Sequence, residues 1–204
     1  MKRLLLMLPT FAVAAIFIIL TGDCSGKRAD NAVPRRTAYP RVELYDSAYR
    51  QAADSLPLVL MVNDSATVDI ARHGDEATWI DVRYPRYGAV LRLTLSRLDK
   101  GALLKAIANR YERMALNAGG LPSTVTTLAA PDGLSSEIVE TPGAMVTPLQ
   151  IIATDSTSLL LTGALEMPPA SADGDNDAER YMPVVKGVER DLMHMAKHLT
   201  ITEK

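Results

Sequence analysis

Two apolar runs separated by a short polar corner dominate the C-terminal half of the chain. Residues 149–153 and 159–165 are almost continuously hydrophobic, and residues 154–158 between them read TDSTS. This pattern predicts a β-hairpin with a five-residue connection. Because nearly continuous apolar strands are usually covered on both faces, we expect the hairpin at the centre of a sheet. Gly163, inside the second run, indicates a bulge or a close approach of the backbone.

Alternation of apolar and polar positions predicts further strands. In residues 79–84, Trp79, Asp81 and Arg83 face one way and the intervening residues Ile80, Val82 and Tyr84 face the other. Pro85 ends this strand, and residues 89–95 alternate again. Further strands are expected at residues 39–45, 58–62, 67–72, 125–129 and 138–141.

The hydrophobic period changes after Asp99 to about 3.6 residues, which predicts an amphipathic helix. Asp99 is a suitable N-cap, and Gly119 and Gly120 form a suitable C-terminal stop. The predicted apolar stripe consists of Leu103, Leu104, Ile107, Ala108, Tyr111, Met114 and Ala115. The predicted solvent face carries Lys105, Asn109, Glu112 and Arg113.

A second helix is predicted at residues 178–198, after a Pro- and Asp-rich stretch at residues 166–177 that we expect to be a mobile loop. Pro183 is tolerated best in a first turn, so the regular part of this helix should begin nearer Tyr181. Its apolar stripe consists of Tyr181, Val184, Val185, Val188, Leu192, Met195 and Leu199.

The order of strands, helix, strands and helix predicts an α+β fold: a mainly antiparallel sheet with two amphipathic helices packed on it. The pattern leaves open whether both helices cover one face of the sheet or one face each. We expect a single domain over residues 39–204, preceded by a signal segment at residues 1–23 and a flexible tether at residues 24–38.

The N-terminus has the organisation of a secretory signal. Lys2 and Arg3 precede an uncharged apolar run at residues 4–20, and Cys24, the only cysteine, follows closely. Its position resembles that of the acylated cysteine of bacterial lipoproteins, so we predict lipidation of Cys24 with palmitate-type acyl chains. The preceding residues Thr21 and Asp23 differ from the usual lipoprotein motif. An uncleaved membrane anchor, or ordinary cleavage without lipid, are the alternatives.

Composition excludes several classes. The chain has 204 residues and a formal net charge of −2. It therefore has no excess of basic residues, which a nucleic-acid-binding protein would need. A single cysteine allows no disulfide within the chain.

Candidate catalytic and metal sites are incomplete. His194 and His198 are four residues apart and share a helix face with Asp191, as zinc ligands can, but no further ligand stands out. The remaining histidine, His73, lies in a predicted turn, and no G-x-S-x-G motif accompanies it. A catalytic Ser–His–Asp triad whose members meet only in the folded protein remains an alternative.

The stretch from Asp173 to Asp177 starts like a calcium loop. Ala178 stands where such a loop needs glycine, and Val184 stands where it needs glutamate. We therefore predict no catalytic residue, no metal and no cofactor.

Several motifs resemble the GldD family of gliding-motility lipoproteins of Bacteroidota. They are a basic, proline-containing segment at residues 34–43, a Trp strand followed by Y-P-x-Y at residues 79–87, the Gly-containing approach at residues 143–150, the TDS corner, the G-A-L end of the second hairpin strand, and Asp191-x-x-His194. The spacing holds over residues 34–198. Three leucines at residues 159–161, where aromatics are commoner, and the acidic loop indicate a divergent member.

The resemblance implies a membrane-anchored, periplasm-facing lipoprotein with a structural or accessory role in gliding motility and type IX secretion, whose partners are other envelope proteins. The family has no established catalytic residues. Lys27 and Arg28, close after Cys24, favour retention facing the periplasm over export to the cell surface. Two alternatives remain. A ligand-binding lipoprotein would need an apolar pocket between sheet and helices, with residues 168–177 as its lid, and a hydrolase would need converging polar groups.

Overall fold

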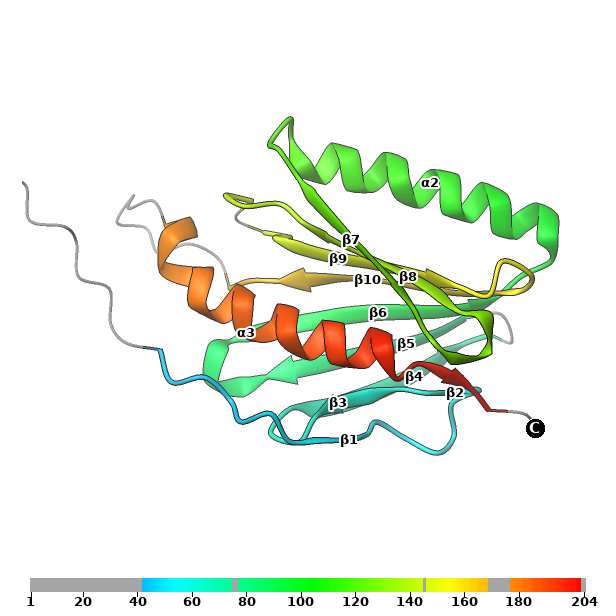
Figure 1. Cartoon of the computed structure of the whole chain (residues 1–204), viewed down its shortest axis with the longest axis horizontal. Coiled ribbons are helices and arrows are strands. Elements are labelled where there is room, and N and C mark those ends of the chain that lie inside the picture. Colours follow the sequence, from blue (N-terminus) through cyan, green and yellow to red (C-terminus); the bar gives the residue numbers. More distant parts are fainter. Residues whose placement is uncertain (1–41, 75–76, 145, 169–176, 203–204) are drawn as a thin grey trace, which may run out of the picture. The chain divides into compact units, whose positions relative to one another are not determined.

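The computed structural model describes residues 42–74, 77–144, 146–168 and 177–202 (Figure 1). Cys24, the predicted signal segment and the predicted tether lie outside the described residues. So do residues 169–176 of the predicted mobile loop, which include most of the calcium-like stretch.

Among the described residues, seven strands form one antiparallel sheet in the order β4-β5-β6-β10-β9-β8-β7. The bounds are β4 (Thr67–His73), β5 (Ala77–Tyr84), β6 (Ala89–Arg97), β7 (Thr124–Ala129), β8 (Ser135–Glu140), β9 (Leu149–Thr154) and β10 (Leu159–Glu166). Strand β10 lies at the middle of this order with β9 beside it, so the predicted central hairpin is confirmed. A Cβ on Gly163 of β10 would overlap the Leu93 side chain and crowd the Arg92 carbonyl, which explains the glycine as a close approach.

The two helices cover opposite faces of the sheet. In β10, Leu161 and Leu165 point into a large core closed by α3 (Asp177–Lys197), whereas Leu160 packs against Leu103 of α2 (Lys100–Ala118). Figure 1 shows α3 crossing the sheet and α2 lying along the β9–β10 side. The hairpin is therefore covered on both faces, which accounts for its nearly continuous hydrophobic sequence. The predicted alternation of β5 is also confirmed, since Ile80, Val82 and Tyr84 are buried.

Short strands complete the α3 side. Strand β1 (Tyr49–Gln51) pairs with β3 (Met61–Asn63), and β2 (Leu58–Val59) pairs with β11 (Thr200–Ile201). The strand predicted at residues 58–62 is thus divided at Leu60, because its two ends pair with different strands. Two 3-10 turns, η1 (Pro85–Tyr87) and η2 (Pro131–Gly133), follow β5 and β7.

The strand predicted at residues 39–45 is wrong for its described part. Residues 42–48 form no sheet ladder. Instead of bonding to another strand, the Tyr45 N–H donates to the Tyr87 hydroxyl at 2.7 Å.

Helix α2 has the predicted ends and only part of the predicted buried face. Asp99 Oδ1 accepts from the N–H groups of Gly101 and Ala102 at 2.8 and 2.9 Å, and Gly119 closes the helix in the left-handed conformation. Leu104, however, is 62% exposed and Tyr111 is 43% exposed. Leu103 and Met114 of the predicted stripe are buried and Ile107 packs beside Leu103. The half-buried Arg110 completes this face, because α2 rests only on the narrow β9–β10 region.

Helix α3 confirms the predicted range and the predicted apolar stripe, but the expectation that its regular part begins nearer Tyr181 is wrong. The helix begins at Asp177, so Pro183 lies inside it rather than in the first turn. The proline removes one backbone hydrogen bond. The turns that follow are held by Val184, Val185 and Val188, all of which are buried in the core.

Candidate functional site

A buried carboxylate near the end of α3 organises the most polar part of the interior. Asp191 is 3% exposed, and its Oδ1 accepts a hydrogen bond from the Tyr49 hydroxyl at 3.0 Å and from Arg190 Nη2 at 3.3 Å. Burial raises the pKa of Asp191, and the bonds from Tyr49 and Arg190 only partly oppose this. Burial and the bond to Asp191 raise the pKa of Tyr49. The Asp191 carboxylate therefore holds β1 against α3.

The two histidines predicted to share a helix face do lie together, stacked rather than splayed around a metal. The His194 ring stacks on the Tyr49 ring, with centroids 3.7 Å apart and an angle of 8°. His198 stacks on His194 at 4.1 Å. Burial, and then the proximity of His198, lower the pKa of His194, so the neutral imidazole is favoured. Among the described residues, no group of three or more His, Cys, Asp or Glu side chains could hold a metal ion.

The same cluster fixes the lead-in segment, residues 42–46, to the domain. Arg190 Nη2 donates to the Tyr45 carbonyl at 2.8 Å. Asn63 Nδ2, from β3, donates to the Asp46 carbonyl at 2.8 Å. The backbone of a segment without a sheet ladder is thus satisfied by side chains of α3 and β3.

The Y-P-x-Y corner holds the lead-in segment from the other side. Pro85 opens η1, which turns the chain so that Tyr87 reaches the Tyr45 N–H. In return, the Tyr45 hydroxyl accepts from the Arg86 N–H at 3.0 Å. The Tyr45 and Tyr87 rings lie 4.7 Å apart, and the Arg86 guanidinium sits 4.7 Å from the Tyr45 ring centroid. We call Tyr45, Tyr49, Tyr87, Arg190 and Asp191 the N-terminal clamp.

The TDS corner has a structural role. Asp155 Oδ1 accepts from the N–H groups of Thr157, Ser158 and Leu159 at 2.8 to 2.9 Å. Burial alone would raise the pKa of Asp155, but the hydrogen bonds from Thr157, Leu159 and Ser158 outweigh it and hold the pKa well below its usual range. The carboxylate thereby closes the β9–β10 hairpin.

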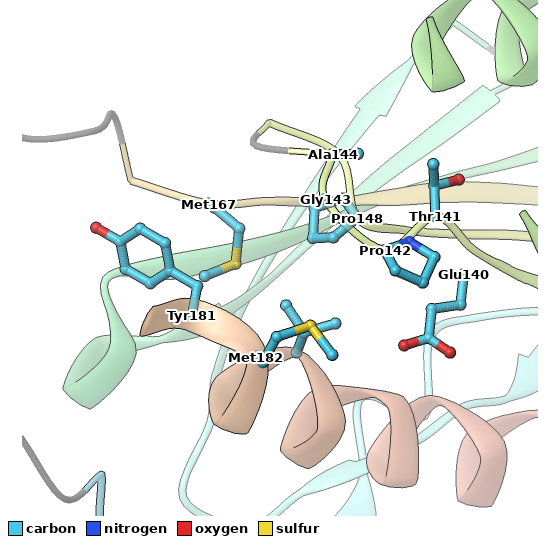
Figure 2. Close-up of a pocket in the computed structure, with 10 residues that line it drawn as sticks. Glu140, Thr141, Pro142, Gly143, Ala144, Pro148, Met167, Tyr181 and Met182 are labelled. Carbon is cyan, nitrogen blue, oxygen red and sulfur yellow. The ribbon is translucent and has the colours of Figure 1, made fainter. Parts of the chain in front are cut away.

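The pocket that the ligand-binding alternative would need between sheet and helices is nearly filled where α3 meets the segment after β8. Figure 2 shows its lining, which consists of Tyr181 and Met182 of α3, Met167, and residues 140–144 with Pro148. The volume left is about 10 Å³, which is room for a single water at most. A small-molecule ligand does not fit at this place.

His73 lies away from the clamp. It stacks on Trp79 of β5, with ring centroids 4.5 Å apart, on the sheet face opposite α3. The structure therefore brings together only two of the three histidines.

The sequence reasoning missed most of the clamp. Tyr49 falls in a stretch without clear periodicity, and Arg190 reads as one charged position on an amphipathic helix. The available signals were the Y-P-x-Y and Asp-x-x-His motifs, since Tyr87 and Asp191 both belong to the clamp.

Comparison with known proteins agrees with these motifs. The family described as gliding motility lipoprotein GldD matches residues 29–201. A search of the curated proteins found no match. Within the described part of the chain, no helix is both long and apolar enough to cross a membrane. The matched region spans the described domain from the lead-in segment to β11, so the chain belongs to the family of the gliding motility lipoprotein GldD.

Proposed function

We propose that this chain is a lipid-anchored, periplasm-facing accessory component of the gliding motility and type IX secretion machinery, and that it acts without catalysis of its own. Family membership gives the coarser statement, a membrane-anchored lipoprotein of the cell envelope linked to gliding motility. The proposed role is to hold a rigid domain near the membrane, where it contacts other envelope proteins.

The N-terminal clamp is the observation that carries this proposal. A domain held by its N-terminal end transmits any pull through the residues where the domain begins. Here those residues are hydrogen-bonded to α3 through Arg190 and to the β5–β6 corner through Tyr87. Because Tyr45 and Tyr87 are also part of the main core, the attachment point and the core are one unit. Such a connection suits a mechanical or scaffolding role.

The clamp residues also support a non-enzymatic role. Asp191 is buried and already bonded to Tyr49 and Arg190, so its carboxylate is committed to structure. His194 is sandwiched between Tyr49 and His198. The Asp191 carboxylate is thus engaged in hydrogen bonds and the His194 ring in stacking, as is typical of side chains with a structural role.

The intact mass of the protein extracted from native membranes tests the anchor. We expect the mass of residues 24–204 plus a diacylglycerol and an acyl group, and we expect the Cys24→Ser variant to lack both. Full-length mass in both proteins would show that residues 4–20 remain as a transmembrane anchor instead. A soluble, cleaved and unlipidated product would overturn the lipid anchor.

Secretion of a type IX cargo by the native host tests the accessory role. We expect a deletion strain to lose secretion and the wild-type gene to restore it. Restoration should fail with Cys24→Ser and weaken with Tyr45→Ala, which opens the clamp. Tyr111→Ala, an exposed tyrosine on α2, is the matched control and should restore secretion fully. Normal secretion by the deletion strain would contradict the proposed link.

A further inference from the structure

Part of the sheet face opposite α3 is open and hollowed. Helix α2 packs against β9 and β10 and leaves β4, β5 and β6 beside it exposed. A shallow hollow of about 380 Å³ lies over these three strands. This volume is within the usual range of small-ligand sites, roughly 300–1,000 Å³. The side chains named below line or border it.

An exposed tryptophan forms one wall of this hollow. Trp79 is 48% exposed, although tryptophan is normally largely buried. His73 stacks on the indole and fixes its orientation. In the strand register, Trp79 lies between Ala71 of β4 and Thr94 of β6, two small side chains that leave room beside the ring. The ring is thus held with part of its surface facing solvent.

Paired charges form the other wall. Arg83 bonds Asp69 at 2.7 Å and Asp81 at 3.0 Å, and Arg92 bonds Asp81 at 2.8 Å and Glu166 at 2.6 Å. Both guanidinium groups are therefore already neutralised by carboxylates. These bonds use Oδ2 of each aspartate, and no described residue bonds Oδ1 of Asp69 or Asp81. Those oxygens remain able to accept hydrogen bonds.

An exposed aromatic ring beside paired charges favours binding of a neutral polyol that has one apolar face. A pyranose ring carries C–H groups on its faces, which pack on an aromatic ring, and hydroxyls around its rim, which bond planar polar side chains. An anion finds no unpaired cation in the hollow, because Arg83 and Arg92 already carry three carboxylates between them. We propose that the hollow over β4–β6, walled by Trp79 and the Asp81 ion-pair network, is a binding site for a neutral oligosaccharide.

A protein partner suits the surface less well. Protein interfaces have an apolar core several residues wide, surrounded by a polar rim. Trp79 is the only large hydrophobic side chain of β4, β5 and β6 that is exposed, and charged side chains border it. An isolated aromatic ring bordered by charged side chains offers contact to a sugar ring and not to an extended apolar surface.

The test uses the single tryptophan of the chain as its own reporter. Full-length protein is purified in lauryl dimethylamine oxide, because maltoside detergents carry the proposed ligand chemistry. Chitotetraose, with amino-sugar units like those of cell-wall strands, and maltotetraose, a plain glucan, are titrated separately. We expect at least one to shift the tryptophan emission saturably. Which one binds distinguishes the two sources of the same chemistry. A sulfated tetrasaccharide should not bind.

Variants measured by calorimetry locate the site. Trp79→Ala should weaken binding by about tenfold or more, because ring stacking is lost, and Trp79→Phe should weaken it less. Ala71→Arg keeps the tryptophan but fills the hollow, so it should abolish binding. This variant keeps the test valid if Trp79→Ala fails to fold. Tyr111→Ala removes an exposed aromatic ring outside the hollow and should bind normally.

Two results would overturn the proposal. One is that neither neutral oligosaccharide produces an emission shift or a heat of binding. The other is that Ala71→Arg and Trp79→Ala bind as tightly as the wild type. Cross-linking of Trp79 to an envelope protein, without any oligosaccharide binding, would assign the surface to a protein partner instead. The site does not depend on the proposed secretion role, so either idea can fail alone.

Discussion

On one face of the sheet, α3 closes a core that extends from Tyr45 to Leu199, whereas on the other face α2 rests on a small cluster of Leu103, Ile152 and Leu160. The residues of α3 that face the sheet are almost all buried aliphatics. Helix α2 places the half-buried Arg110 on its sheet side and leaves Leu104 and Leu116 in solvent. Both helices are amphipathic by sequence, so amphipathicity alone does not measure how much a helix stabilises the domain.

The difference assigns separate roles to the two faces. The α3 face contains the clamp and the main core, so it carries most of the stability and the connection toward the N-terminus. The α2 face is only partly covered and includes the hollow beside Trp79. Recognition surfaces need exposed side chains, and the less stabilising face supplies them at lower cost to the fold.

The largest contrast should come from truncating a leucine on each helix. Leu192 of α3 is 0% exposed, so Leu192→Ala should lower the free energy of unfolding by about 2–5 kcal/mol through lost contacts and the remaining cavity. Leu104→Ala on α2 is the matched control and should change it by less than about 0.5 kcal/mol. Urea denaturation followed by circular dichroism measures both. Similar losses in the two variants would refute the division between the faces.

Removing one tyrosine hydroxyl from each face should give the next largest contrast. Tyr49→Phe keeps the stacking on His194 but leaves the buried Asp191 carboxylate without its tyrosine donor, which should cost about 1–3 kcal/mol. Tyr111→Phe removes a shorter bond, 2.7 Å from the Tyr111 hydroxyl to Glu137, but in an exposed place on α2. Its cost should stay below about 0.5 kcal/mol. The same denaturation measurement applies, and equal costs would mean that burial does not control the Asp191 bond.

Replacing the cation beneath α2 should have a smaller effect, of opposite sign. Arg110 Nη2 donates to the Gly163 carbonyl at 2.5 Å, but its Nε is buried without a partner in the described residues. Burial, and then Arg113, lower the pKa of Arg110. Arg110→Met keeps the length of the side chain and removes the unsatisfied donor, so stability should rise by up to about 1 kcal/mol. A loss of more than about 1 kcal/mol would show that the Gly163 bond matters more than the orphaned Nε. Thermal melts of the two proteins suffice.

The sequence predicted the parts of the fold that depend on local patterns. Alternation assigned the two faces of β5, the continuous apolar runs placed β9 and β10 at the centre, and Asp99 and Gly119 ended α2. In each case the signal lies within a few neighbouring residues. The stripe predicted for α2 was only partly right, because its hydrophobic positions are spread too widely to define one face: Leu103 and Met114 are buried, but Leu104 is exposed. Only the narrow β9–β10 contact turns Arg110 inward and Leu104 outward.

The clamp could not be predicted in the same way. Tyr49 and Asp191 are 142 positions apart, so their contact leaves no periodic trace in either segment. The lead-in segment even looked like a strand, because an apolar and aromatic run is typical of strands whether or not a partner strand exists. Motif resemblance pointed to Tyr87 and Asp191, but not to the segment that they hold.

The smallest predicted effect is a pH dependence confined to the α3 face. The lowered pKa of His194 means that the folded state binds its proton less readily than the unfolded chain, whose histidines titrate near about 6.5. Stability should therefore be complete above that pH and fall as the pH is lowered through it toward the folded pKa. Asp191 acts oppositely. Its raised pKa makes stability decline as the pH rises from about 3.9 toward the folded pKa.

Melting temperatures between about pH 7.5 and pH 5.5 cover the histidine window. The groups that face His194 are Tyr49, Asp191, Lys197 and His198, and all are kept in the His194→Gln variant. This variant should lose part of the slope. His73→Gln, on the other face of the sheet, should keep the whole slope, because its histidine stacks on Trp79 and not on the clamp. An unchanged slope in His194→Gln, or a slope lost in His73→Gln, would show that acid sensitivity does not reside in the clamp.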